Sequence, residues 1–222
     1  MTYKDIISVY ENKKKIYIKD TYKYISKLLK EIKEIHRQDA LSRGITDTEQ
    51  SWRAFKGKNL EKLIEHIIKD EIEKLNLSII NGNILEHNKY SDNNKLDLLK
   101  RNLAIDYGEF GMHLPDVDII IYEPNKSKII AVLSVKVTLR ERIAQTGYWK
   151  LKLMNSNITK NIKVFFITLD EDDIFSKKPA KKGRAIVEVD TDGCYILTEN
   201  EFEKSSKVKL FSEFINDLKK LK

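Results

Sequence analysis

The chain has few of the residues that mark disulfide-linked, loop-rich or membrane-embedded proteins. Its 222 residues include one cysteine, Cys194, with 3 prolines and 8 glycines. One cysteine excludes an intrachain disulfide and a thiolate-based zinc site. No apolar run approaches the roughly 20 residues of a membrane span, and the N-terminal residues lack the apolar core of a signal peptide. We therefore expect a cytoplasmic protein with no membrane association.

Acidic residues are in deficit, which favours an anionic partner. The sequence has 41 Lys and Arg against 34 Asp and Glu, a formal net charge of +7. The excess is mostly lysine, which contacts phosphate as a point charge and carries little information about base identity. The hydrophobic fraction of 41% is sufficient for a core. Length and composition predict a single domain over residues 1–222.

Two short apolar runs in the middle of the chain, residues 117–122 and 129–137, predict a pair of antiparallel strands. The turn-forming segment 123–128 joins them. Asp116 stands where the first strand begins and Lys136 near the end of the second, so antiparallel pairing brings the two side chains together at one rim. A carboxylate that holds a divalent cation beside a lysine that orients the attacking water is typical of a metal-dependent nuclease. The plainer interpretation is a salt bridge at the end of an ordinary hairpin.

These residues resemble the PD-(D/E)xK nuclease superfamily. Pro115-Asp116 matches the PD element, and Ser134-Val135-Lys136 occupies the (D/E)xK position, 20 residues from Asp116 to Lys136, with serine where an acid is usual. The next charged triplet, Arg140-Glu141-Arg142, resembles one that follows the lysine in several type II restriction endonucleases. The resemblance covers about residues 53–150.

The resemblance implies a Mg²⁺ site at the strand ends. Asp116 would be the first ligand and the backbone carbonyl of Val135 another, with Lys136 completing the catalytic group. Ser134 carries no charge, so it replaces an acid only by orienting a metal-bound water through a hydrogen bond. A second carboxylate must then come from elsewhere in the chain.

Three acids compete for that role. Residues 55–61 (FKGKNLE) resemble the first-helix motif of the superfamily, in which a glycine and then a glutamate precede an apolar helical run, and this favours Glu61. Asp118 is the alternative on the strand, and Glu141 the alternative on the downstream helix. The plainer interpretation of Glu61 is a solvated acid in a first helical turn, where the helix dipole favours it.

Two groups of residues are candidates for DNA contact. Arg140 and Arg142 carry guanidinium forks that suit the O6 and N7 atoms of guanine, and Glu141 suits a cytosine amine or braces the forks. The cations near Trp52 are candidates for the DNA backbone: Arg53, Lys56 and Lys58.

The hydrophobic pattern predicts an α/β fold with a mixed central β-sheet flanked by helices and a helical N-terminal extension. The resemblance implies that the core is restriction-endonuclease-like. The expected divisions are the extension at 1–52, the catalytic core at 53–200 and a C-terminal helix at 201–222. The expected helices are 3–36, intact or broken near Asn12, then 54–75, 141–152 with an interruption at Gly147, and 202–221. A loop is expected at 37–52, and further strands at 164–169, 185–189 and 194–197.

The resemblance implies a type II restriction endonuclease, a Mg²⁺-dependent enzyme that hydrolyses phosphodiester bonds at a short, specific site in double-stranded DNA. We expect a homodimer, because a palindromic site offers two equivalent phosphates to a two-fold protein. One alternative is a structure-selective repair or junction nuclease. The other is a catalytically inert DNA-binding relative, which Ser134 keeps open.

Overall fold

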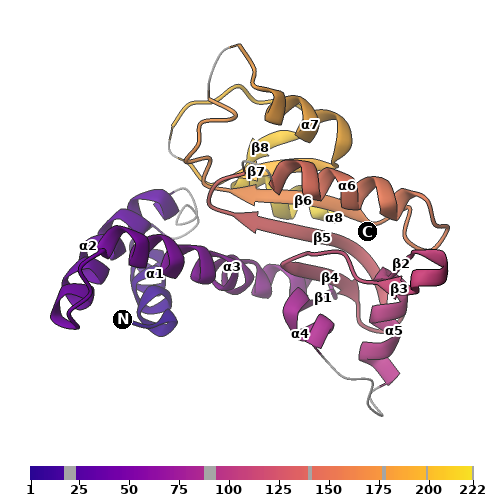
Figure 1. Ribbon diagram of the computed structural model, residues 1–222, viewed down its shortest axis with the longest axis horizontal. Helices are drawn as coiled ribbons and strands as arrows, with labels where there is room; N and C mark the ends of the chain where they lie inside the picture. The colour runs from indigo at the N-terminus through magenta and orange to yellow at the C-terminus, as the bar shows by residue number, and fades with distance from the viewer. Residues whose placement is uncertain (18–23, 88–93, 140–141, 177–178, 199, 222) are drawn as a thin grey trace.

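The computed structural model describes residues 1–17, 24–87, 94–139, 142–176, 179–198 and 200–221 (Figure 1). Arg140 and Glu141, two of the expected base readers, lie outside these ranges. Within them, no helix is both long enough and apolar enough to cross a membrane. The fold is α/β, as predicted, with helices on both faces of a mixed sheet.

A six-stranded sheet forms the centre of the molecule. Its spatial order is β1 (Ser78–Asn81), β4 (Ile119–Glu123), β5 (Lys128–Lys136), β6 (Lys163–Thr168), β7 (Gly193–Ile196) and β8 (Val208–Leu210). The β1–β4 and β4–β5 pairs are antiparallel, and the pairs from β5 to β8 are parallel. A separate two-stranded sheet pairs β2 (Ile105–Asp106) with β3 (Met112–His113).

The helices cover the sheet from both sides. They are α1 (Tyr3–Tyr17), α2 (Ile25–Ser42), α3 (Thr48–Lys74), α4 (Gly82–His87), α5 (Asn94–Leu103), α6 (Arg142–Met154), α7 (Lys182–Asp190) and α8 (Phe214–Lys219), with 3-10 turns at Gly108–Phe110 and Phe211–Glu213. Figure 1 shows α6 and α7 on one side of the sheet, while α3 runs from the α1–α2 pair to the other side.

Alternation along the central strands explains this layering, since successive side chains in a strand point to opposite faces. Ile119, Ile121 and Leu133 belong to the core formed with α1, α2, α3 and α8. Ile120 and Val132 belong to a core on the opposite face. Because both faces are buried, the hairpin strands are continuous apolar runs, and this is why the hairpin was predictable.

The N-terminal region is more helical than expected. Two helices, α1 and α2, occupy the segment expected to be helical, and α1 passes through Asn12, so the alternative with a break near that residue is wrong. The expected loop at 37–52 is also wrong, because α2 continues to Ser42 and α3 begins at Thr48. Asp47 caps α3 by accepting a 2.8 Å hydrogen bond from the Gln50 amide, the type of interaction that starts helices.

Two predictions around α6 and α7 fail for a shared reason. Helix α6 is not interrupted at Gly147, where a Cβ atom would lie 3.3 Å from the Cβ of Asp190 in α7. The glycine therefore permits close packing of two helices. The expected strand at 185–189 is part of α7, in which Val187 is fully buried and Val189 is 75% exposed.

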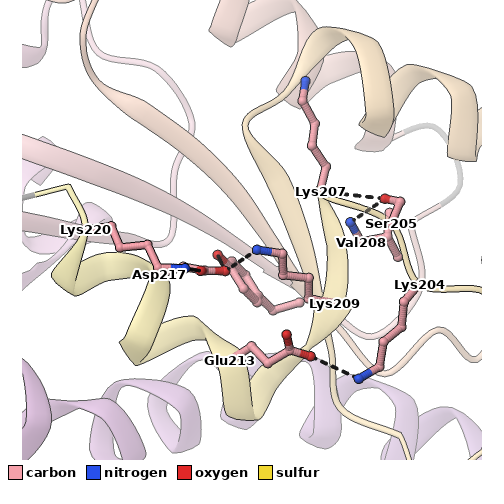
Figure 2. A network of polar contacts seen from close by, with 9 residues as sticks. Lys204, Ser205, Lys207, Val208, Lys209, Glu213, Asp217 and Lys220 are labelled. Atoms are coloured by element: carbon pink, nitrogen blue, oxygen red, sulfur yellow. Dashed lines mark hydrogen bonds and ion pairs between the residues drawn. The ribbon is translucent and has the colours of Figure 1, made fainter.

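The C-terminal segment is not one helix over 202–221. It contributes the edge strand β8 before the short helix α8, and side-chain contacts join the two (Figure 2). Asp217 of α8 accepts hydrogen bonds from Lys209 at 2.6 Å and Lys220 at 2.9 Å, while Glu213 accepts one from Lys204 at 3.1 Å. An amphipathic pattern alone did not reveal the strand within this segment.

Candidate active site

The ends of β4 and β5 place a carboxylate against a lysine, but the carboxylate belongs to Asp118. The Lys136 Nζ atom donates to Asp118 Oδ1 at 2.9 Å and to Oδ2 at 2.7 Å. The Val135 amide also donates to Oδ2, at 2.6 Å. Asp118 is buried while Lys136 is half-buried. A charge this far from water is stabilised only by such partners.

The expected pairing of Asp116 with Lys136 is wrong, and the hairpin register explains why. Residue 116 would stand opposite residue 136 if antiparallel pairing continued beyond Ile119↔Leu133. Pairing instead begins at Ile119, and the Asp118 amide donates to the Leu133 carbonyl at 3.0 Å as the chain leaves the ladder. Asp116 is exposed, and its Oδ2 accepts a 3.0 Å hydrogen bond from Gln145 of α6.

Glu61 of α3 lies in the same cleft as Asp118 and Lys136. Burial raises the pKa of the Glu61 carboxyl, and the negative charge of Asp118 raises it further. The Asn81 side chain opposes both effects by donating a hydrogen bond to Glu61 Oε1, and the charge of Lys136 also opposes them. The upstream glutamate expected from the sequence is therefore brought to the strand ends.

The Asn81-Gly82 step supports this arrangement of Glu61 and Asp118. Asn81 ends β1 and holds Glu61, while its Oδ1 accepts from the Asn83 amide at 3.0 Å. Gly82 donates its amide to the Asp118 carbonyl at 2.9 Å, and a Cβ atom here would collide with the Val117 carbonyl. The lack of a side chain at residue 82 thus allows α4 to begin directly beside Asp118.

This cleft, termed the catalytic cleft below, has a volume of about 640 Å³. Besides the three residues above, Arg53, Val135 and Arg142 are among its lining residues. One expected site residue is placed differently. Ser134 is 3% exposed and does not line the cleft, so its hydroxyl is not positioned to orient a water there.

The remaining candidates divide between the cleft and the outer surface. Lys56 lines the cleft but is buried, and its ammonium forms an ion pair with Glu171 at 2.5 Å. Arg53 is exposed in the cleft. Lys58 is exposed but lines neither this cleft nor a second one beside it.

The donor set of the catalytic cleft fits a hard divalent cation. Asp118 and Glu61 provide carboxylate oxygens, the ligands that such cations prefer. Their mutual repulsion, which contributes to the raised pKa of Glu61, is relieved by positive charge. Over the described ranges, no cluster of three or more His, Cys, Asp or Glu side chains is arranged to hold a metal ion. A cation at this place would therefore depend on two carboxylates and on main-chain or water oxygens.

Comparison with known proteins identifies the family. A family model described as BsaWI restriction endonuclease type 2 matches residues 95–217. MjaVIP of Methanocaldococcus jannaschii, assigned as a type II restriction enzyme, is 39% identical over 180 residues, covering 78% of each chain. The chain belongs to the type II restriction endonucleases.

A second relative agrees with this membership, and a solved structure shares the fold. HpyAORF263P of Helicobacter pylori, also assigned as a type II restriction enzyme, is 46% identical over 129 residues, or 57% of this chain and 64% of the relative. The fold resembles that of restriction endonuclease PspGI, solved as a substrate DNA complex, with a TM-score of 0.55 and 17% identity over 100% of this chain and 93% of that chain.

Membership defines the reaction class. Type II restriction endonucleases are site-specific deoxyribonucleases, and enzymes of this family generally use divalent metal ions. The protein is thus an endonuclease that cleaves DNA at a specific site.

Proposed function

We propose that the enzyme hydrolyses phosphodiester bonds at a short, specific site in double-stranded DNA with Mg²⁺, using Asp118, Glu61 and Lys136. The observation that carries this proposal is the convergence of the three side chains in one cleft. Asp118 takes the role that the sequence suggested for Asp116, because Asp118 is the carboxylate against Lys136.

Each residue has a defined task in this proposal. Bound Mg²⁺ would supply the positive charge that stabilises a developing phosphorane and lowers the pKa of water. Asp118 and Glu61 would hold the cation, and the Val135 carbonyl remains a candidate third oxygen ligand. Lys136 is fixed by Asp118 at the cleft surface, where its ammonium can hold the attacking water or a phosphate oxygen.

Base recognition is proposed for the start of α6. Arg142 is the first residue of that helix, is exposed, and lines the catalytic cleft. A guanidinium fork here suits a guanine edge beside the cleaved phosphate. Arg140 and Glu141 remain proposals from sequence alone.

We also propose that two copies act together, in the cytoplasm. Each chain has one such cleft, so cleavage of both strands at a two-fold site calls for two related copies. A cytoplasmic location agrees with the free, buried Cys194, since secreted proteins more often pair their cysteines. Sedimentation velocity with and without cognate duplex tests the dimer.

The decisive experiment for the nuclease proposal is plasmid digestion with the purified protein, in Mg²⁺ and in EDTA. Discrete fragments that require Mg²⁺ support the proposal, particularly if Asp118→Asn abolishes them and Asp116→Asn does not. Smearing or selective cutting of branched DNA would instead assign a structure-selective nuclease. Intact plasmid together with DNA binding would assign an inert relative.

A further inference from the structure

A second cleft lies beside the catalytic one, with α2 forming part of its wall. Its volume is about 470 Å³, and it shares Arg53, Lys56 and Glu171 with the catalytic cleft. Lys27, Lys30 and Lys33 of α2 also line it. The two clefts therefore form adjoining parts of one surface.

The three lysines form a fixed row. Residues three apart in an α-helix lie on the same side, and at 1.5 Å per residue Lys27 and Lys33 are about 9 Å apart along the axis. The opposite side of α2 is anchored in the core by Leu28, Leu29 and Ile32, each no more than 4% exposed. The row is thus held in place by the fold, although the lysine side chains themselves are mobile.

Two of the cations in this cleft already have partners. Lys33 forms an ion pair with Glu49 at 2.7 Å, and Lys56 is paired with Glu171. The carboxylate of Asp170 is buried and accepts hydrogen bonds from the amides of Ile174 and Phe175 at 2.7 and 3.1 Å.

Three other cations in the cleft are available. Lys27, Lys30 and Arg53 are exposed, and none of them has a hydrogen-bond or ion-pair partner among the residues that the structure describes. The remaining acid, Asp173, accepts a 3.1 Å hydrogen bond from the Ser176 hydroxyl. The cleft is thus lined by five cations and four acids, and the three cations without an acidic partner among the described residues are all exposed. Arg53, which both clefts share, connects them to the catalytic cleft.

We propose that the α2 cleft binds the sugar–phosphate backbone of duplex DNA outside the recognised base pairs. This inference rests on the proposed function, since it assumes that the duplex occupies the catalytic cleft. Lysines spaced along a helix match phosphates without reading bases. Arg53, shared by both clefts, would contact the strand as it passes from one to the other. The N-terminal helices would then add affinity for flanking DNA and leave site choice to α6.

The test compares a Lys27→Ala/Lys30→Ala variant with the wild type on two cognate duplexes. The site is first mapped by plasmid digestion, then placed in one duplex with flanks of about 3 bp and in another with flanks of about 15 bp. Binding is measured by fluorescence anisotropy at several salt concentrations, without divalent metal. The matched control is Lys4→Ala/Lys69→Ala, two exposed lysines of α1 and α3 that line neither cleft.

On the long duplex, the slope of log K against log salt should decrease by about 2 in magnitude, since each lysine–phosphate contact contributes about 0.9. On the short duplex the variant should match the wild type, and the control should match it on both. An unchanged slope on the long duplex, or an equal change on both duplexes, would overturn the proposal. Inhibition of wild-type binding by millimolar inorganic phosphate on the short duplex alone would also overturn it.

The outcome is separable from that of the nuclease proposal. A random duplex of about 40 bp requires no mapped site. If the wild type fails to cleave plasmid but the Lys27→Ala/Lys30→Ala variant loses salt-dependent binding to this duplex, the α2 cleft is a DNA site and the nuclease assignment fails. Discrete cleavage with no effect of the variant on any duplex would reject the α2 cleft alone.

Discussion

The Oδ2 atom of Asp118 accepts two hydrogen bonds at once, from the Lys136 ammonium at 2.7 Å and from the Val135 amide at 2.6 Å. Both donors belong to the end of β5, so this strand end fixes the carboxylate that immediately precedes its antiparallel partner β4. Such charge-assisted contacts restrict the carboxylate to one orientation. These contacts distinguish Asp118 from Asp116, which lies only two positions earlier in the sequence and contacts Gln145 instead.

Asp118→Asn is expected to lower the single-turnover cleavage rate by at least ~100-fold, because the amide is similar in shape but neutral and binds a cation poorly. DNA binding should persist or tighten. Asp116→Asn is the matched control and should retain a rate within a few-fold of wild type. Loss of cleavage in the Asp116 variant, with Asp118→Asn active, would reverse the assignment.

Glu61→Gln should raise the Mg²⁺ concentration needed for half-maximal cleavage and lower the maximal rate. It should also raise the melting temperature of the metal-free protein at neutral pH. Burial and Asp118 raise the folded-state pKa of Glu61, so ionisation of this carboxyl costs stability once the pH exceeds its unfolded value of about 4.3. Calorimetry at pH 4 and pH 7 checks the sign: the difference between variant and wild type should vanish at the lower pH.

Asn81→Ala removes the donor that lowers the pKa of Glu61. The pKa should rise further, so the acid limb of the pH–rate profile should move to higher pH at fixed, subsaturating Mg²⁺. High Mg²⁺ should partly restore activity, because the cation competes with the proton. The control is Asn83→Ala. Asn83 is exposed, and it contacts the Asn81 side chain only through its backbone N–H, which alanine keeps. Identical profiles for both variants would remove Asn81 from the site.

Lys136→Ala should decrease the single-turnover rate by about 100-fold, the scale for loss of a charge-stabilising group. Because Asp118 then loses its ion-pair partner in a buried position, unfolding should also become easier, by about 1–3 kcal/mol. Urea denaturation measures the second effect independently. A variant that is destabilised yet cleaves at the wild-type rate would assign Lys136 a structural role only.

Arg142→Ala should weaken binding to a cognate duplex by about 1–3 kcal/mol if the guanidinium contacts a base edge. Binding to a random duplex of equal length should change less. Equal losses on the two duplexes would reassign Arg142 to a phosphate contact. The comparison uses anisotropy titrations at one salt concentration, since salt alone changes both affinities.

The sequence was sufficient for the central hairpin, the mixed sheet and the position of Glu61. Continuous apolar strands flanked by turn residues are a local signal, and so is the glycine-then-glutamate motif that precedes the apolar run from Leu63 to Ile72 in α3. The choice between Asp116 and Asp118 was not local. It depends on the residue at which the β4–β5 ladder begins, and this is set by the Gly82 and Leu133 contacts of the Asp118 backbone.

The errors near the C-terminus have a related origin. Residues 185–189 alternate enough to suggest a strand, yet close packing at Gly147 makes them one side of a helix. In the segment after residue 202, β8 exists because Cys194↔Val208 pairing extends the parallel sheet. Neither contact has a signature within the short window that a periodic pattern covers.

Helix α3 is continuous over 27 residues, and it carries both Arg53, at the junction of the two clefts, and Glu61, beside Asp118. Eight residues correspond to about 12 Å along a helix axis, with no hinge between them. A displacement of Arg53 along the helix axis is therefore expected to move Glu61 with it. DNA contact at Arg53 would be transmitted through one rigid helix to Glu61, and through it to the spacing of the Glu61 and Asp118 carboxylates.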